Sequence, residues 1–221
     1  MRRALLSWSG GKDCAWALQK LRGTGVAIAA LLTTVDEATN SVAMHAVPCE
    51  LLEWQARAAG LPLWTAPLPW PCANRDYERI MKTIWDRARA NDIDAVVFGD
   101  LFLEDIRAYR EKTLEGTGLT PLFPLWKSPT AALAEEMLQG GLRALTACVD
   151  KRALGPEFAG REFDRGFLAD LPSGIDPCGE NGEFHSFVYD GPMFRERVPV
   201  RVGNVRDHNG FAFADLQCLE S

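Results

Sequence analysis

Residues 3–14 read RALLSWSGGKDC, and this stretch decides how the rest of the chain is interpreted. The apolar segment Arg3–Trp8 predicts a short buried strand, two glycines follow it, and Asp13–Leu21 predicts a helix. A helix N-terminus presents unpaired N–H groups and a partial positive charge, and both attract phosphate. Glycine lets the backbone approach phosphate oxygens without a Cβ in the way. The sequence therefore predicts a phosphate-binding turn, to which Ser9 adds a hydroxyl and Lys12 a charge.

The spacing of this turn differs from that of the two common glycine-rich phosphate motifs. It is neither GxxxxGK[ST] nor the dinucleotide fingerprint GxGxxG. An ordinary Gly-Gly turn between a strand and a helix is the alternative interpretation.

Strand-like and helix-like segments alternate through the first half, which indicates a parallel sheet covered by helices. The helix predicted at 74–90 carries its apolar residues on one face, as a core-packed helix does. Further strands are predicted at 26–35, 61–66, 94–98 and 119–123, and further helices at 48–59 and 104–114. We therefore predict an α/β fold with a five-stranded parallel, Rossmann-like sheet.

The pattern changes near residue 125. A helix is predicted at 128–139 and a strand at 144–149, and three alternating segments follow at 184–190, 195–202 and 211–219. Asn209-Gly210 is typical of a hairpin turn between the last two. We therefore predict a nucleotide-binding domain over 1–125 and a smaller α+β domain over 126–221.

Composition excludes several classes of protein. The 221 residues are 47% hydrophobic and 24% charged, as in ordinary folded proteins. The net charge of -6 argues against nucleic acid as the main partner, because nucleic-acid binders need basic surface. The six cysteines include no CxxC pair, which argues against a zinc site or a redox dithiol. The longest apolar run, Val26–Leu32, is too short for a membrane span, so we expect a cytoplasmic protein, with a homodimer as the common default.

The loop SGGKDC (9–14) is similar to the SGGxDS pyrophosphate-binding loop of the N-type ATP pyrophosphatases, which have the adenine nucleotide α-hydrolase-like fold. This chain has Cys14 where the family has its second serine. A thiol is a weaker hydrogen-bond donor than a hydroxyl. The alternative is that Cys14, at a helix N-terminus, is a nucleophile of low pKa.

Further segments narrow the resemblance to the diphthine–ammonia ligase-like family. They are MHAV (44–47), Gly99-Asp100 with Glu104 and Arg107, PLW (124–126), CGENGEFH (178–185) and DGP (190–192). The resemblance implies an ATP- and Mg²⁺-dependent ligase that adenylates an acceptor carboxylate and amidates it with ammonium, releasing AMP and pyrophosphate. The acceptor it implies is a small molecule or a protein side chain, such as diphthine on an elongation factor or an acid of cobalamin metabolism.

The resemblance also assigns site residues. It places ATP at Ser9, Gly10, Gly11, Lys12, Asp13, Cys14, Thr33, Gly99 and Arg107, and Mg²⁺ at Asp100. It places the acceptor at His45, Glu180, Asn181 and Glu183, and gives catalytic roles to Lys12, Asp100, Glu183 and His185. Two other functions remain open, a sulfur-transferring ATP pyrophosphatase acting on tRNA and a non-catalytic ATP-binding regulator.

Several of these residues have a plainer interpretation. Asp100 follows a predicted strand, where open α/β sheets bind ligands, and is either a Mg²⁺ ligand or the cap of the next helix. Arg107 either stabilises phosphate charge or is a solvated arginine. His45 either contacts nucleotide or acceptor or packs in a loop. Thr33 and Thr34 end the second predicted strand, where they would line the adenosine pocket.

Glu180, Asn181, Glu183 and His185 form the densest polar cluster of the second half. In a strand, Glu183 and His185 would share a face, since they are two residues apart. Such a pair would orient ammonium and accept its proton, a general-base role typical of His or Glu. The alternative is a polar turn followed by a solvent-facing strand edge.

Overall fold

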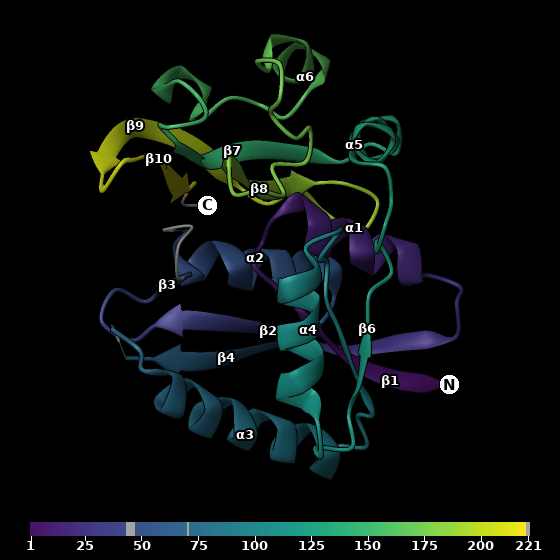
Figure 1. Cartoon of the computed structure of the whole chain (residues 1–221). Helices are drawn as coiled ribbons and strands as arrows, with labels where there is room; N and C mark the ends of the chain where they lie inside the picture. The colour runs from purple at the N-terminus through teal and green to yellow at the C-terminus, as the bar shows by residue number, and fades with distance from the viewer. Residues whose placement is uncertain (43–46, 70, 220–221) are drawn as a thin grey trace.

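The structure is a computed structural model of the chain, and it describes residues 1–42, 47–69 and 71–219. It consists of two sheets with helices between and around them (Figure 1). Sheet A contains β1 (Arg2–Ser7), β2 (Val26–Asp36), β3 (Ser41–Val42), β4 (Leu63–Leu68), β5 (Ala95–Val97) and β6 (Thr120–Leu122). The five parallel strands predicted from the sequence are confirmed, and the two-residue β3, antiparallel to β2, was not expected.

The order of the strands in sheet A creates a natural ligand site. β1 lies centrally, with β2 and then β4 on one side and β5 and then β6 on the other. Along the chain, strands are therefore added outward from β1 first on the side of β2 and β4, and then on the side of β5 and β6. In open α/β sheets, ligands bind beyond the carboxyl ends of the two strands where this reversal occurs. Here those strands are β1 and β5.

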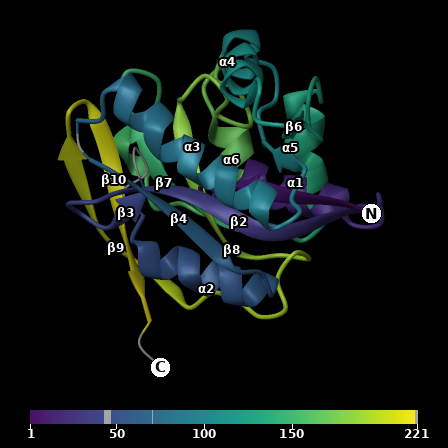
Figure 2. The ribbon, with the colours of Figure 1, turned by 90° about the horizontal axis from the view of Figure 1, so that it is seen from below.

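Helices cover both faces of sheet A. The faces carry α1 (Lys12–Leu21), α2 (Cys49–Ala59), α3 (Asn74–Ala90) and α4 (Glu104–Leu114). α1 and α2 lie on one face and α3 on the other; Figure 2, a view from below, has α3 crossing in front of the sheet. The apolar side of α3, including Met81, Ile84 and Trp85, packs in one core cluster with strand residues such as Leu5 and Leu32. The periodicity of this helix therefore reflects core packing, as predicted.

Sheet B packs over α1 and α2, on the side away from sheet A (Figure 1). Its antiparallel order is β8 (Phe184–Asp190), β7 (Arg143–Asp150), β10 (Phe211–Cys218) and β9 (Val200–His208). Outside it lie the 3₁₀ turn Pro156–Phe158 and α6 (Arg165–Asp170), whereas α5 (Thr130–Gln139) lies beside the end of the sheet and contacts α1. One continuous apolar core includes residues of both sheets and of α1 and α2. All strands of sheet A precede residue 125 and all strands of sheet B follow it.

One predicted strand is shifted. The segment 195–202 was expected to be a strand, but β9 begins at Val200 and continues to His208. Arg195 instead donates its backbone N–H to the Ala58 carbonyl at 2.7 Å, so this part of the chain fastens sheet B to α2. The predicted Asn209-Gly210 turn is confirmed, with both residues at positive φ (49° and 85°). In the part of the chain that the structure describes, no helix is long and apolar enough to cross a membrane.

Candidate active site

The glycine-rich loop lies at the end of β1 and is held from the second half of the chain. Gly10 has φ +82°, and a Cβ on Gly11 would lie 3.2 Å from the carbonyl oxygen of Ser186. Ser186 accepts the backbone N–H of Lys12 at 3.1 Å, and Val188 donates its N–H to the Gly10 carbonyl at 2.9 Å. Strand β8 therefore braces the loop directly, and side chains at these glycines would disturb that contact.

A buried glutamine ties the same elements together. Gln55 on α2 donates its amide to the carbonyls of Gly10 (3.0 Å) and Val188 (2.6 Å) and accepts from the Trp8 indole N–H at 2.8 Å. Gln55 is a site residue that was not expected from the sequence. Its signal is a polar side chain among the apolar residues of one helix face, between Leu52 and Ala56.

Lys12 is buried where the loop meets the segment 176–183. Its ammonium is 2.9 Å from the Asp13 carboxylate, also donates to the Cys178 carbonyl, and lies 5.3 Å from the centre of the Phe184 ring. Burial by itself would lower the pKa of Lys12, but the Asp13 carboxylate and the other acidic groups around it raise that pKa overall. The side chain therefore carries its positive charge inside the protein, beside the loop.

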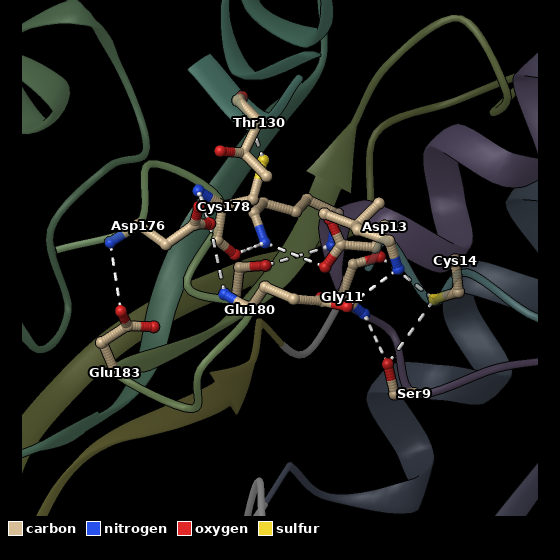
Figure 3. A network of polar contacts seen from close by, with 12 residues as sticks. Ser9, Gly11, Asp13, Cys14, Thr130, Asp176, Cys178, Glu180 and Glu183 are labelled. Atoms are coloured by element: carbon tan, nitrogen blue, oxygen red, sulfur yellow. Dashed lines mark hydrogen bonds and ion pairs between the residues drawn. The ribbon is translucent and has the colours of Figure 1, made fainter. Parts of the chain in front are cut away.

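Cys14 serves the loop as a neutral thiol. Its sulfur donates to the Gly11 carbonyl at 3.1 Å and lies 3.6 Å from the Ser9 hydroxyl (Figure 3). Burial is the main cause that raises the pKa of Cys14 above its ordinary value. The geometry therefore favours a neutral thiol that hydrogen-bonds within the loop over a nucleophile of low pKa.

Glu183 binds its own segment. Its carboxylate accepts the backbone N–H groups of Asp176 (3.1 Å) and Asn181 (3.0 Å) and the side-chain amide of Asn181 (3.0 Å). The side chain is 7% exposed, and Glu183 immediately precedes β8. The structure thus separates the pair expected from the sequence, because Glu183 shapes the loop while His185 lines the cavities described below.

Glu180 reaches across to the first half. Its carboxylate accepts the backbone N–H of Leu101 at 2.8 Å and that of Phe102 at 3.4 Å, in the turn after β5. Burial, followed by the negative charge of Asp13, raises the pKa of Glu180 to about 7, against the opposing effect of its backbone hydrogen bonds. Figure 3 shows Glu180 directed toward Asp13 and away from Glu183. Of the two glutamates, Glu180 is the one at the candidate site.

Two neighbouring cavities lie beyond β1 and β5. The larger, about 440 Å³, is lined by residues that include Ser9, Thr34, Asp100 and His185. The smaller, about 130 Å³, lies between the loop and the segment 178–186, and Ser9 and His185 line both. Residues on both sides of position 125 therefore form one site at the reversal point of sheet A.

Thr33, expected to face the cofactor, points the other way. Its side chain is 1% exposed, and its hydroxyl donates to the Trp8 carbonyl. Thr34 lines the larger cavity instead. Successive side chains of a strand face opposite sides, and β2 continues to Asp36, so the two threonines lie within the strand rather than at its end.

Asp100 lies in the larger cavity, just past β5. The first residues of α4 are Glu104 and Asp105 and its N-cap is Leu103, so the helix-cap interpretation of Asp100 is wrong. Burial is the main cause of a raised pKa for Asp100; Arg110 opposes it and Asp13 adds to it.

The donor set fits a magnesium ion. Among the described residues, Oδ2 of Asp100 and Oδ1 of Asp13 are buried without a hydrogen-bond partner. No three His, Cys, Asp or Glu side chains within 1–42, 47–69 and 71–219 gather as a metal site. Mg²⁺ is commonly bound by one or two carboxylates together with phosphate oxygens and water. Two carboxylate oxygens without a hydrogen-bond partner, of which that of Asp100 has a long ion pair to Arg110 (3.5 Å), suit that arrangement beside a phosphate-type loop.

Other expected residues lie elsewhere. Arg107 donates to Glu111 at 2.8 Å, with its guanidinium over the rings of Phe123 and Trp126, and the arginine that lines the larger cavity is Arg110. A Cβ on Gly99 would lie 3.0 Å from backbone atoms of Asp13 and Cys14, so this glycine allows β5 to approach α1. His45 lies outside the described residues.

The matching family models and the similar named proteins agree with each other. Residues 1–121 match the family described as diphthamide synthase N-terminal domain, and residues 129–217 match the diphthamide synthase C-terminal domain. The chain is similar to diphthine–ammonia ligases of Danio rerio (27% identity, 96% of this chain and 91% of that protein) and Bos taurus (24%, 96% and 87%). A solved structure, titled as a predicted subunit of tRNA methyltransferase from Methanocaldococcus jannaschii, is 14% identical over 90% of this chain and 100% of that chain, with a TM-score of 0.47.

Proposed function

The chain belongs to the diphthamide synthase family, and from that premise we propose that it is an ATP-dependent ligase that converts a carboxylate into its amide with ammonia. The relatives named diphthine–ammonia ligase, at 24–27% identity, support the class of reaction. AMP and pyrophosphate are the proposed products. A small-molecule or protein-borne carboxylate is the proposed acceptor.

One observation carries the proposal. The SGGKDC loop opens, at the reversal point of sheet A, into a cavity to which both halves of the chain contribute. Ser9 comes from the loop, Asp100 from the turn after β5, and His185 from β8. A nucleotide and a second substrate would meet there, which adenylation requires.

Each end of the site suits one part of ATP. The loop glycines and the charge of Lys12 would bind the β- and γ-phosphates, as helix N-termini bind anions. The face of β2 that carries Thr34 would lie against the adenosine. Asp13 and Asp100 would hold Mg²⁺, whose charge would neutralise the triphosphate. Most of the acceleration would come from alignment of the reactants and from charge neutralisation.

The proposed reaction has two steps. An acceptor carboxylate oxygen attacks the α-phosphorus, the bond from that phosphorus to the bridging oxygen breaks, and pyrophosphate leaves with the electron pair. Ammonia then attacks the acyl carbon, AMP leaves, and the nitrogen loses a proton. His185, which lines both cavities, and Glu180, with its pKa of about 7, would accept that proton.

Purified protein with α-labelled ATP, Mg²⁺ and pooled organic acids tests the proposal. We expect labelled AMP only when both acids and ammonium are present, and a hydroxamate when hydroxylamine replaces ammonium. Bound ATP without turnover would contradict the ligase and favour the non-catalytic regulator. AMP that depends on tRNA and a sulfur donor would contradict it in favour of the sulfur-transferring enzyme.

A further inference from the structure

Arg110 is a cavity-lining cation whose hydrogen bonds are incompletely made. It projects from α4 into the larger cavity, where its guanidinium lies 5.1 Å from the centre of the Phe98 ring. Its Nε is 3.5 Å from Oδ2 of Asp100, an ion pair too long for a good hydrogen bond. Among the described residues, both of these atoms are buried without a hydrogen-bond partner. Buried unpaired polar atoms are costly, and a bound ligand would remove that cost.

A groove leads away from Arg110 between α3 and α4. It has a volume of about 570 Å³ and shares Tyr77, Met81, Trp85 and Thr113 with the larger cavity, so the two spaces adjoin at these side chains. Met81 and Trp85, core residues that are 5% and 6% exposed, make this boundary partly apolar. Polar side chains, including Glu78, Lys82, Asp86 and Lys112, line the outer part. Two adjoining spaces therefore lie between the loop and the surface beside α3, with Arg110 in the inner one.

The two sides of the cavity suit different ligands. Ser9, Leu32, Thr34 and Val42 line the side formed by β1, β2 and β3, where the nucleotide would lie. Arg110 lies on the opposite side, past the turn that follows β5. A guanidinium pairs with a carboxylate through parallel N–H bonds, which fixes the orientation of the acid. Tyr77 stands close enough to Arg110 to feel its charge, yet burial raises the pKa of the phenol, so Tyr77 keeps its proton and remains a donor.

We propose that Arg110 binds the carboxylate of the acceptor and that the groove between α3 and α4 holds the remainder of that molecule. The inference rests on the proposed function. It specifies an acid whose carbon skeleton next to the carboxylate is apolar, to match Met81 and Trp85, and whose far end is polar or attached to a larger molecule. Asp100 would hold Mg²⁺, and the Arg110 guanidinium, whose ion pair with Asp100 is long at 3.5 Å, would bind the acid.

Direct binding of a graded set of acids tests this inference. The protein is saturated with a non-hydrolysable ATP analogue and Mg²⁺, and binding of phenylacetate through 5-phenylpentanoate is measured by calorimetry or ligand-observed NMR beside the matching primary amides. We expect affinity to rise with chain length and each acid to bind at least about tenfold tighter than its amide. Arg110→Met should abolish that difference while leaving the affinity for the analogue unchanged, and Arg110→Lys should retain part of it.

Three further variants test the position of the groove. Arg79→Met removes an exposed arginine of α3, 68% exposed and paired with Asp76, and should leave acid binding as in the wild type. Thr113→Trp fills the junction between cavity and groove, so it should exclude the long acids and retain phenylacetate. Thr113→Val, of unchanged size, should bind the whole series.

The possible outcomes are distinct. Equal binding of acid and amide, no binding of any acid, or acid binding unchanged in Arg110→Met would each overturn the inference. If the ATP analogue itself failed to bind the wild type, the proposed function would fail instead. The best acid, coupled through its phenyl end to a small carrier protein, distinguishes the source of the acceptor. Undiminished binding of the conjugate indicates a protein-borne carboxylate, and binding of the free acid alone indicates a small molecule.

Discussion

The two polar segments that meet at the start of α1, residues 9–14 and 176–183, differ in how their side chains are used. In the first, backbone groups form the phosphate-type turn, and the Cys14 and Ser9 side chains hydrogen-bond within it. In the second, Asp176 and Glu183 fasten their own backbone, and Glu180 alone of its three acidic side chains reaches the turn after β5. A motif rich in carboxylates thus contains both scaffold and candidate reactive groups, and only tertiary structure separates the two.

The largest effect is expected where the backbone makes the site. Gly10→Ala would introduce a Cβ at φ +82° and 2.9 Å from Oε1 of Gln55, so we expect the free energy of unfolding to fall by about 3 kcal/mol. Gly174→Ala is the matched control, because its φ is +92° and nothing lies within 4 Å of its Cβ. It should lose about 1 kcal/mol. Denaturant titrations measure both, and equal losses would show that the contact with Gln55 imposes no constraint.

A smaller loss of stability is expected from the scaffold glutamate. Glu183→Gln removes a charged acceptor from three hydrogen bonds and should lower the free energy of unfolding by about 2 kcal/mol. Glu196→Gln changes an exposed carboxylate near β9 and should alter it by less than about 0.5 kcal/mol. Denaturant midpoints at pH 7 compare the two. A Glu183→Gln variant as stable as the control would contradict the scaffold role.

Glu180 should make the free energy of unfolding depend on pH. Its pKa is raised from 4.5 to about 7 in the folded protein, so the folded state binds more protons than the unfolded state between these values. The free energy of unfolding must then fall as pH rises through that interval, by linkage. Unfolding of wild type and Glu180→Gln from pH 4 to 8 isolates the contribution. We expect the wild type to lose stability relative to the variant, and parallel curves would show that Glu180 titrates normally.

The smallest effect is expected at Cys14. A serine hydroxyl reproduces the donor to the Gly11 carbonyl, so Cys14→Ser should change the rate of AMP formation by less than about fivefold, or 1 kcal/mol. Turnover assays with saturating ATP measure it. A collapse of activity in a variant that still folds would mean that the thiol takes part in the reaction.

The sequence predicts the sheet and the loop because both depend on local patterns. Apolar runs, glycines and helical periodicity identify β1, α1 and α3 without knowledge of their neighbours. Thr33 and Thr34 face opposite sides of β2 because side chains alternate along a strand. The sequence alone does not indicate which of the two sides lines the cavity.

Local sequence patterns do not predict long-range contacts. Arg107 and Arg110 lie one helical turn apart, and the packing of α4 decides which of them enters the site. Gln55 and Ser186 brace the loop from positions far along the chain, so only the folded arrangement identifies them.

A crystal structure with a non-hydrolysable ATP analogue and Mg²⁺ tests the central claim most directly. We expect the terminal phosphates on the backbone of residues 9–13, the adenosine against β2 at Thr34, and the metal between Asp13 and Asp100. An analogue bound elsewhere, or none bound at millimolar concentration, would contradict it.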